Sequence, residues 1–512
     1  MFSVWFRIVA LAAALAAGAI PAFGQGGTLR AGLASLPSEV DPATALDGAV
    51  PLVAQQVFDT LVQYVQGGSD IEPGLAAEWM VSRDGLVWSF RLRSGVRFHD
   101  GTALTAQHVV ESLGREIFPG HALAPGRSLA GRLLRGMPGV VKEIRAKDAR
   151  TVEIILHQPY APLVTVLAHP VFSIVLPATP GASGNRWQGT GPFAVTEIGT
   201  GRMVLDAKPG HWRGGPRLGR IVFAEAADEA QAQLTLDAQG LDVYFPAGAP
   251  SRPTGAVSMP GWHIGYLALQ TEKEPFKRVK VRRAIAAALD PGLIASALGP
   301  VASPLQAFLP GGVWGRRDGP PLMGADPERA RRLLVEAGLT ASATATLVVP
   351  ELDKRIDQAK VAEAIRTALG AAGFGVTAQI EPSEAALTLA QTGEHQMLIG
   401  EGYVAGGDPH FLLYSLSASE GAIKGASAVN FSFYRDGRLD DLLIRASQLS
   451  FRPERQRLYV RAQAMLADAL PWIPLYVRMH WAVARPEVRS LRLHPSGNPR
   501  LDRVWLDTTT AR

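Results

Sequence analysis

A histidine and an aspartate stand side by side at His99 and Asp100, and a second histidine, His108, follows nine residues after the first. An imidazole beside a carboxylate could act as a general base or bind a metal, but either role needs further groups converging on the pair. No partner with ligand spacing follows, and Asp100-Gly101 is a common turn dipeptide. A turn is therefore the favoured interpretation, and a secreted hydrolase that uses His99 and Asp100 is the alternative.

The segment Gly189-Thr190-Gly191-Pro192-Phe193-Ala194 matches the dinucleotide fingerprint G-x-G-x-x-A. Those glycines must open a helix whose N-terminus faces the pyrophosphate. Residues 193–198 instead have the pattern of a strand, and no acidic residue stands about 20 positions further on. The chain also lacks the G-x-S-x-G, H-E-x-x-H and Walker motifs. We therefore expect neither a nucleotide site nor another cofactor, and the chain is not expected to be an enzyme.

Composition excludes several further classes. The 512 residues contain no cysteine, so a disulfide scaffold, a cysteine-ligated metal, a cysteine nucleophile and a lipid-modified cysteine anchor are all ruled out. The formal charge of +5 is spread thinly over a long chain and does not indicate nucleic-acid binding. Hydrophobic residues make up 47 % of the chain, enough for more than one core.

The first 24 residues have the pattern of a secretory signal peptide. Arg7 supplies a positive start, residues 8–20 form an apolar run, and Pro21 breaks it before Ala22-Phe23-Gly24. The run is shorter than the about 20 apolar residues that a membrane span needs. We expect cleavage after Gly24 and a soluble periplasmic protein that is not a lipoprotein, and a retained anchor is the alternative.

Alternation of apolar and polar residues predicts several short strands. They fall at residues 86–92, 152–156, 203–205, 221–223, 346–349 and 397–399, the first continuing through Val96 and Phe98. Apolar stripes at helical spacing predict helices at residues 281–289, 327–337, 362–372 and 458–469. Asp326 is a predicted N-cap and Gly338 a predicted helix end. Strands and helices mix along the chain, so the predicted fold class is α/β.

A set of longer motifs follows in a fixed order along the chain. Its members are Asp41-Pro42, Phe58-Asp59-Thr60-Leu61, Glu72-Pro73-Gly74-Leu75-Ala76, Phe98-His99-Asp100-Gly101-Thr102, Gly189-Thr190-Gly191-Pro192-Phe193, Pro275-Phe276, Asp326-Pro327, Asp408-Pro409 and Ala469-Leu470-Pro471-Trp472-Ile473-Pro474-Leu475-Tyr476. Together they resemble the family 5 extracellular solute-binding proteins, which are the peptide, dipeptide and nickel receptors of ATP-driven importers. The resemblance covers nearly all of the chain after the signal peptide.

The resemblance implies a two-lobed, type II periplasmic-binding-protein fold of the large cluster, with an extra subdomain and a ligand cleft between the lobes. Lobe I would comprise residues 25–51, 189–263 and 478–512, the inserted subdomain residues 52–188, and lobe II residues 264–477. Crossings at residues 262–270 and 475–481 would form the hinge, and ligand would favour the closed form. The implied partners are a peptide or other small ligand and a membrane permease, and the mature chain would be monomeric.

The peptide receptors of this family capture the peptide's α-ammonium with an aspartate in a segment resembling Gly-Trp-x-Ala-Asp-Tyr-x-Asp-Pro. Here the segment is about one residue shorter, with Tyr403 in place of tryptophan and Ala405 or Gly406 where the aspartate stands. Asp408 matches the later acid. A buried ammonium needs a carboxylate, so either Glu401 or Asp408 substitutes, or the ligand lacks a free α-amine.

Further cleft residues follow from the same resemblance. A solvated helix face is the favoured interpretation of Lys360 and Arg355, and the alternative is that one of them receives a peptide carboxylate. His410 would contact a metal complex as in the nickel receptors of the family. The resemblance also places Leu46, Asp47, Tyr266 and Gln270 at the ligand. The predicted function is capture of a peptide or peptide-like ligand for an ABC importer. The alternatives are a non-peptide ligand, such as a metal chelate, haem, an oligosaccharide or an amine-free metabolite, and a structural or chaperone protein of the cell wall.

Overall fold

The computed structural model describes residues 26–44, 48–118, 120–124, 140–178, 185–250, 255–339, 343–351 and 356–507. The predicted signal peptide, Leu46, Asp47 and Arg355 lie outside these residues. Within them no single helix has the length and apolar character of a membrane span. One pair of helical segments, Val279–Ala288 and Pro291–Val301, passes that test only jointly and is bent by 61°.

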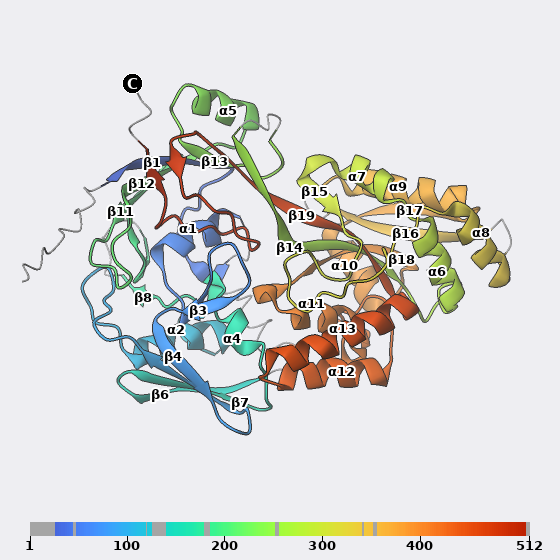
Figure 1. The fold of residues 1–512 in the computed structure, drawn as a ribbon, viewed down its shortest axis with the longest axis horizontal. Helices are drawn as coiled ribbons and strands as arrows, with labels where there is room; N and C mark the ends of the chain where they lie inside the picture. The colour runs from blue at the N-terminus through green and yellow to red at the C-terminus, as the bar shows by residue number, and fades with distance from the viewer. Residues whose placement is uncertain are drawn as a thin grey trace, which may run out of the picture.

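An 11-stranded mixed sheet runs through the molecule (Figure 1). Its strands lie in the order β10-β11-β12-β1-β13-β19-β14-β18-β16-β17, and β15 pairs with β19. The strands are β1 (Gly26–Leu33), β10 (Phe193–Gly199), β11 (Arg202–Ala207), β12 (Leu218–Glu225), β13 (Val243–Phe245), β14 (Ala256–Leu269), β15 (Ala302–Pro304), β16 (Thr344–Glu351), β17 (Gly375–Pro382), β18 (Met397–Tyr403) and β19 (Trp472–Ala484).

Two long strands join the halves of this sheet. β14 and β19 pair antiparallel from Ala256 opposite Val483 to Ala268 opposite Trp472. The C-terminal end of β19 pairs with β13, in the half that we call lobe I, and the C-terminal half of β14 pairs with β18, in lobe II. The pairing register shifts between Pro260 and Ile264, where the strands pass from one half to the other. Bulges bend strands and increase their twist, so the two halves need not be coplanar.

The helices of lobe II lie around β16, β17 and β18. Parallel strands need a crossover connection, and α9 provides it between β16 and β17. These helices are α6 (Val279–Ala288), α7 (Pro291–Leu298), α8 (Pro327–Glu336), α9 (Gln358–Ala371), α10 (Ser383–Thr392), α11 (Pro409–Ser417), α12 (Gly437–Gln448) and α13 (Arg452–Ala469). Lobe I carries α1 (Ala49–Val57) and α5 (Glu229–Asp237).

The inserted subdomain is built on a separate antiparallel sheet of four strands in the order β4-β5-β7-β6. Its elements are β2 (Val62–Tyr64), β3 (Ile71–Pro73), β4 (Ala76–Val81), β5 (Val87–Leu92), α2 (Ala106–Ile117), β6 (Val141–Asp148), β7 (Thr151–Leu156), α4 (Leu163–Val166), β8 (Leu176–Pro177) and β9 (Trp187–Gln188). A two-stranded sheet of β20 (Val488–Arg489) and β21 (Trp505–Leu506) lies near the C-terminus.

The clusters of buried hydrophobic residues do not coincide with the two lobes and the inserted subdomain. One cluster of buried residues runs without a break from the inserted subdomain into lobe II, and a second belongs to lobe I. Leu52, Val53 and Phe58 join the lobe I cluster, although the predicted insertion begins at residue 52. The inserted subdomain is therefore connected through the chain to lobe I but packs its apolar side chains together with lobe II.

Most of the predicted elements are present. Met203 lies opposite Phe223 and Leu205 opposite Ile221, which confirms the predicted strands in β11 and β12. Asp326 Oδ1 accepts a hydrogen bond from Arg329 N, 2.8 Å away, and so caps α8 as predicted. The predicted continuation of β5 through Val96 and Phe98 is wrong: these residues are buried in a turn-rich segment, where the isolated bridge joins Arg97 to Ala103. Burial alone explains their apolar character there.

Candidate functional site

An aromatic cluster lies where the two lobes and the inserted subdomain meet. Trp262 of β14 contacts Tyr64 of β2 and His494 near the C-terminus, with ring centroids 5.3 Å apart in both pairs. Tyr403, the last residue of β18, stacks on His263 at 4.4 Å. Aromatic rings combine a large apolar area with polar tips. We call these five residues the junction cluster, and they place Tyr403 next to the crossing strand β14.

Glu401 lies two residues before Tyr403 on β18 and therefore on the same face of the sheet. Its carboxylate accepts a hydrogen bond from Arg478 Nη2 of β19, 3.2 Å away. The Glu401 side chain is 24 % exposed and that of Arg478 is 7 % exposed. On the same strand, the Tyr476 hydroxyl accepts a hydrogen bond from Gln358 Nε2 at the start of α9, 2.8 Å away. This face thus combines an acid, a base and hydrogen-bonding groups close to the junction cluster.

Asp408 is completely buried and its carboxylate is fully engaged within lobe II. Arg455 Nη2 donates to both carboxylate oxygens, at 2.9 and 2.8 Å, and His410 N donates to Oδ1 at 3.0 Å. Asp408 thereby caps α11, and Pro409 occupies the first turn of that helix. Arg455 is also buried and donates to the carbonyl oxygen of Ala446. An ammonium ion at Asp408 would have to displace this arginine.

The loop before Asp408 lies directly against the inserted subdomain. Ala405 and Gly406 are buried in a short 3-10 turn, η4 (Ala405–Gly407). Gly406 has φ 65°, and a Cβ at this position would lie 2.9 Å from the carbonyl oxygen of Thr165 in α4. A glycine is needed here both for the backbone conformation and for the close approach. The shortened loop therefore leaves no space for an acidic side chain at residue 406.

Three of the predicted ligand residues are buried in lobe II or at its contact with the inserted subdomain. His410 packs between Tyr414, at 4.8 Å, and Tyr160, and burial together with the nearby Arg455 lowers its pKa to about 3. Tyr266 is buried against Trp472. Gln270 is buried, and its amide donates to the carbonyl oxygen of Gly393, 3.2 Å away. Across the described segments, no group of three or more His, Cys, Asp or Glu side chains could hold a metal ion.

Lys360 lies on the surface at the start of α9. Its side chain is 69 % exposed and its Nζ is 3.5 Å from Asp357, the N-cap of the helix. Gln358, two residues earlier, is the residue of this turn that contacts the strand face through Tyr476. Of the predicted ligand residues, the structure thus brings Glu401, Tyr403, Ala405 and Gly406 together near the junction and places Lys360 apart from them.

His99 and Asp100 have structural roles. His99 Nε2 lies 3.0 Å from the carbonyl oxygen of Gly191, and burial lowers the pKa of this histidine to about 4. Asp100 Oδ1 accepts from Thr102 N at 2.8 Å, which confirms the predicted turn. A Cβ at Gly189 would lie 1.9 Å from the carbonyl oxygen of Val57. The glycine-rich segment therefore packs tightly against the end of α1 and leads into the strand β10, not into a helix.

Sequence reasoning did not select His263, Arg478, Tyr64 or His494. Two of these residues could have been found, because His263 and Arg478 are polar side chains within strands that are otherwise largely apolar and that were predicted to cross between the lobes. Tyr64 and His494 have no such local signal. They are 430 residues apart in the chain and are brought together, stacked at 5.1 Å, only by the fold.

The fold and the junction together define a two-lobed binding protein. A family model described as bacterial extracellular solute-binding proteins, family 5 middle, matches residues 70–423. The chain belongs to this family, which consists of substrate-binding receptors of importers and not of enzymes.

Individual relatives match over almost the whole length. Heme-binding protein A of Haemophilus influenzae is 29 % identical over 91 % of this chain and 89 % of its own. Di/tripeptide-binding protein 2 of Pseudomonas aeruginosa is 29 % identical over 92 % of this chain and 93 % of its own. The solved structure of HbpA2 from Haemophilus parasuis superposes with a TM-score of 0.85 at 25 % identity, covering 94 % of this chain and 100 % of that one.

Proposed function

We propose that this protein is the periplasmic receptor of an ATP-driven importer and that it captures a peptide or peptide-like ligand between its lobes. The observation that carries the proposal is the family match along the chain, together with two lobes joined by β14 and β19. A ligand that contacts both lobes only when they are closed shifts the open–closed equilibrium by its differential affinity. Capture requires no bond to be made or broken.

The proposed hinge lies where β14 and β19 shift register, between Pro260 and Ile264. Lobe I then comprises residues 25–51, 189–263 and 478–512 and lobe II residues 264–477, with residues 52–188 inserted. The buried contact of Gly406 with Thr165 supports a closed arrangement in which the inserted subdomain rests on lobe II. Hinges of this type need only a few residues that absorb the change in backbone angles.

We assign recognition of the ligand first to Tyr403 and Glu401. Tyr403 offers an aromatic face at the junction, and Glu401 is a partly exposed carboxylate beside it. Lys360 remains a candidate for the ligand's carboxylate, and Leu46 and Asp47 remain candidates from lobe I. Because Asp408 is held by Arg455, we assign it to the stability of lobe II together with His410. A free α-ammonium would therefore bind Glu401, which must then be shared with Arg478.

A non-peptide ligand is the second candidate. Two observations favour it: the carboxylate of Asp408 is already paired with Arg455, and there is no space for an acidic side chain at Gly406. The name of one relative refers to haem and that of another to di- and tripeptides. Ligands without an α-amine do not need a buried carboxylate opposite them, so this receptor class could hold one.

Isothermal titration with free and N-acetylated di- and tripeptides tests the proposal and separates the two candidates. We expect micromolar or tighter binding of at least one peptide, and Glu401→Gln should weaken a free peptide at least tenfold while leaving its acetylated form within twofold. Lys277→Gln, on the surface of lobe II, is the matched control. If no peptide binds and mass spectrometry finds a non-peptide molecule in the purified protein, the peptide assignment is wrong.

The proposed location is the periplasm, after cleavage of the signal peptide at about Gly24. The partners are the ligand and a membrane permease, and the mature chain acts as a monomer. Mass spectrometry of the secreted protein gives the mature N-terminus, and light scattering gives the molecular mass. A mature chain that begins at Met1, or a stable dimer, would contradict these assignments.

A further inference from the structure

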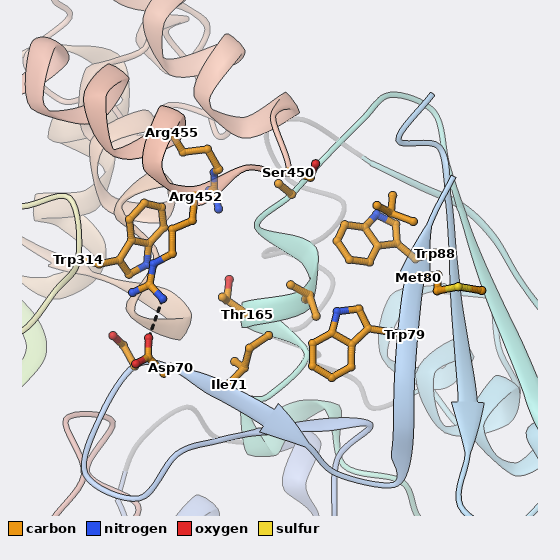
Figure 2. A pocket seen from close by; sticks show the side chains of 14 residues that line it. Asp70, Ile71, Trp79, Met80, Trp88, Thr165, Trp314, Ser450, Arg452 and Arg455 are labelled. Atoms are coloured by element: carbon orange, nitrogen blue, oxygen red, sulfur yellow. Dashed lines mark hydrogen bonds and ion pairs between the residues drawn. The ribbon is translucent and has the colours of Figure 1, made fainter. Parts of the chain in front are cut away.

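A pocket lies between the inserted subdomain and lobe II (Figure 2). It has a volume of about 310 Å³. Trp79 and Trp88 of the inserted subdomain form one wall, and Trp314 of lobe II stands opposite them. None of the ligand residues assigned above lines it. A ligand held here would contact both bodies and would favour the arrangement in which they are packed together.

The walls of this pocket suit an aromatic ring. Besides the three indoles, it is lined by the apolar side chains of Ile71, Val81 and Val164. Trp88 is 5 % exposed, and its indole Nε1 has no acceptor among the described residues. Aromatic rings gain from stacked and edge-to-face contacts as well as from loss of apolar area to water. A buried donor without an acceptor favours a ligand that supplies one.

The charges of the pocket suit an anion. The guanidinium groups of Arg452 and Arg455 each lie 4.9 Å from the centre of the Trp314 ring. Among the residues that line the pocket, these two positive charges face one negative charge, that of Asp70. Arg455 is committed to Asp408, whereas Arg452 pairs with Asp70 at 2.6 Å, and the side chains of Arg452 and Asp70 are 48 % and 66 % exposed. Exposed ion pairs contribute little to stability and exchange partners easily. A ligand carboxylate could therefore take the place of Asp70 on Arg452.

We propose that this pocket binds a small aromatic carboxylate, whose ring lies between Trp314 and the pair Trp79 and Trp88 and whose carboxylate pairs with Arg452. The site is separate from the proposed peptide site, because Glu401 and Tyr403 do not line it. Occupancy bridges the inserted subdomain and lobe II. By reciprocity of linked equilibria, a molecule that favours the packed arrangement increases the affinity of any other ligand that requires it.

The test is isothermal titration of the full mature chain with 2-naphthoate, and with 2-naphthalenemethanol as its neutral analogue. We expect saturable 1:1 binding of 2-naphthoate and at least fivefold weaker binding of the alcohol. Arg452→Gln should weaken naphthoate at least fivefold. Asp70→Asn should strengthen it, because Arg452 is then free, and Trp314→Leu should abolish binding. Arg457→Gln, exposed on the same helix, is the matched control and should leave binding within twofold.

Several results would overturn the proposal. They are the absence of binding up to 5 mM, equal binding of acid and alcohol, and an unchanged affinity in both Arg452→Gln and Trp314→Leu. Displacement of naphthoate by a peptide that binds the Glu401 site would also overturn it, because the two sites would then be one. If Trp314→Leu does not fold, the opposite effects expected for Arg452→Gln and Asp70→Asn decide the question alone. The absence of naphthoate binding has no bearing on whether peptides bind at the Glu401 site.

Discussion

Arg455 Nη2 lies 2.9 and 2.8 Å from the two carboxylate oxygens of Asp408, and both side chains are buried in lobe II. Removing one partner of such a pair leaves the other charge buried without compensation, which is costly. The pair fixes the start of α11 to α13, two elements that are far apart in the chain. It therefore connects the loop at Gly406 with the wall of the aromatic pocket.

Asp408→Asn should lower the free energy of unfolding by about 3–5 kcal/mol, because Arg455 keeps its charge and loses the opposite one. Urea unfolding followed by circular dichroism measures the change. Asp441→Asn, exposed on α12, is the control and should change stability by no more than about 0.5 kcal/mol. A folded Asp408→Asn protein of unchanged stability that no longer binds ligand would assign Asp408 to the ligand instead.

Gly406→Ala should weaken both stability and ligand affinity. An alanine at φ 65° costs about 1–2 kcal/mol, and its Cβ would also press on the carbonyl oxygen of Thr165, 2.9 Å away. Gly373→Ala is the matched control: φ is 81°, but no atom lies within 4 Å of an added Cβ. Both variants should be destabilised by the backbone strain, and only Gly406→Ala should increase the radius of gyration of the liganded protein in X-ray scattering. Equal scattering from the two variants would argue against closure at this contact.

Asp59 gives a test of how lobe I is held to the inserted subdomain. Its Oδ2 accepts hydrogen bonds from Thr190 Oγ1 at 2.9 Å, Trp212 Nε1 at 2.9 Å and His211 Nε2 at 3.3 Å. Burial opposes ionisation of Asp59, but His211, Arg213 and Trp212 outweigh it and lower its pKa. Asp59→Asn should cost about 2 kcal/mol or more, since hydrogen bonds to charged groups are the stronger ones.

Chemical unfolding of Asp59→Asn measures this cost, and Asp100→Asn is its control. Asp100 is exposed, and asparagine keeps the oxygen that accepts from Thr102 N, so the expected change is within about 0.5 kcal/mol. If both substitutions have equally small effects, the hydrogen bonds at Asp59 do not stabilise the interface. If Asp100→Asn alone impairs the protein, the structural role assigned to the turn is wrong.

Acid should destabilise the protein below about pH 6.5. Burial is the main cause that lowers the pKa values of His410 and His494 to about 3. Because an unfolded histidine titrates near 6.5, the unfolded chain binds more protons below that pH. Stability from the neutral histidines is complete above about pH 6.5 and falls as the pH decreases toward 3. Over that range, each of the two histidines lowers the free energy of unfolding by up to about 1.4 kcal/mol for each pH unit of acidification.

His410→Phe isolates one of these contributions. Neither ring nitrogen of His410 has a hydrogen-bond partner among the described residues, and the ring lies between aromatic neighbours, so phenylalanine loses no bond. Urea unfolding at pH 7.5, 6 and 5 should show a shallower decline for the variant, by about 1.4 kcal/mol per pH unit. Identical declines in the variant and the parent would mean that folding does not lower the pKa of His410.

Local sequence patterns predicted most of the elements and the family. Three predicted features depend only on neighbours a few residues away or on alternation, and all three are present. They are the apolar stripe that begins at Val281, the helix cap at Asp326 and the facing pair Met203 and Phe223. The candidate site was harder to predict. Glu401 and Tyr403 lie together near the junction, whereas Gln270 is bonded to Gly393 inside lobe II, and Arg478 was not selected.

The sequence by itself determined the α/β elements, the order of the family motifs and the absence of cysteine chemistry. Only the tertiary structure decided which polar groups are available to a ligand. Asp408 is engaged because Arg455, 47 residues later, is buried against it, and His99 is held by Gly191, 92 residues later. Helical stripes and caps follow from interactions within a turn or two, whereas the pairing of a buried charge depends on which distant segment excludes water from it.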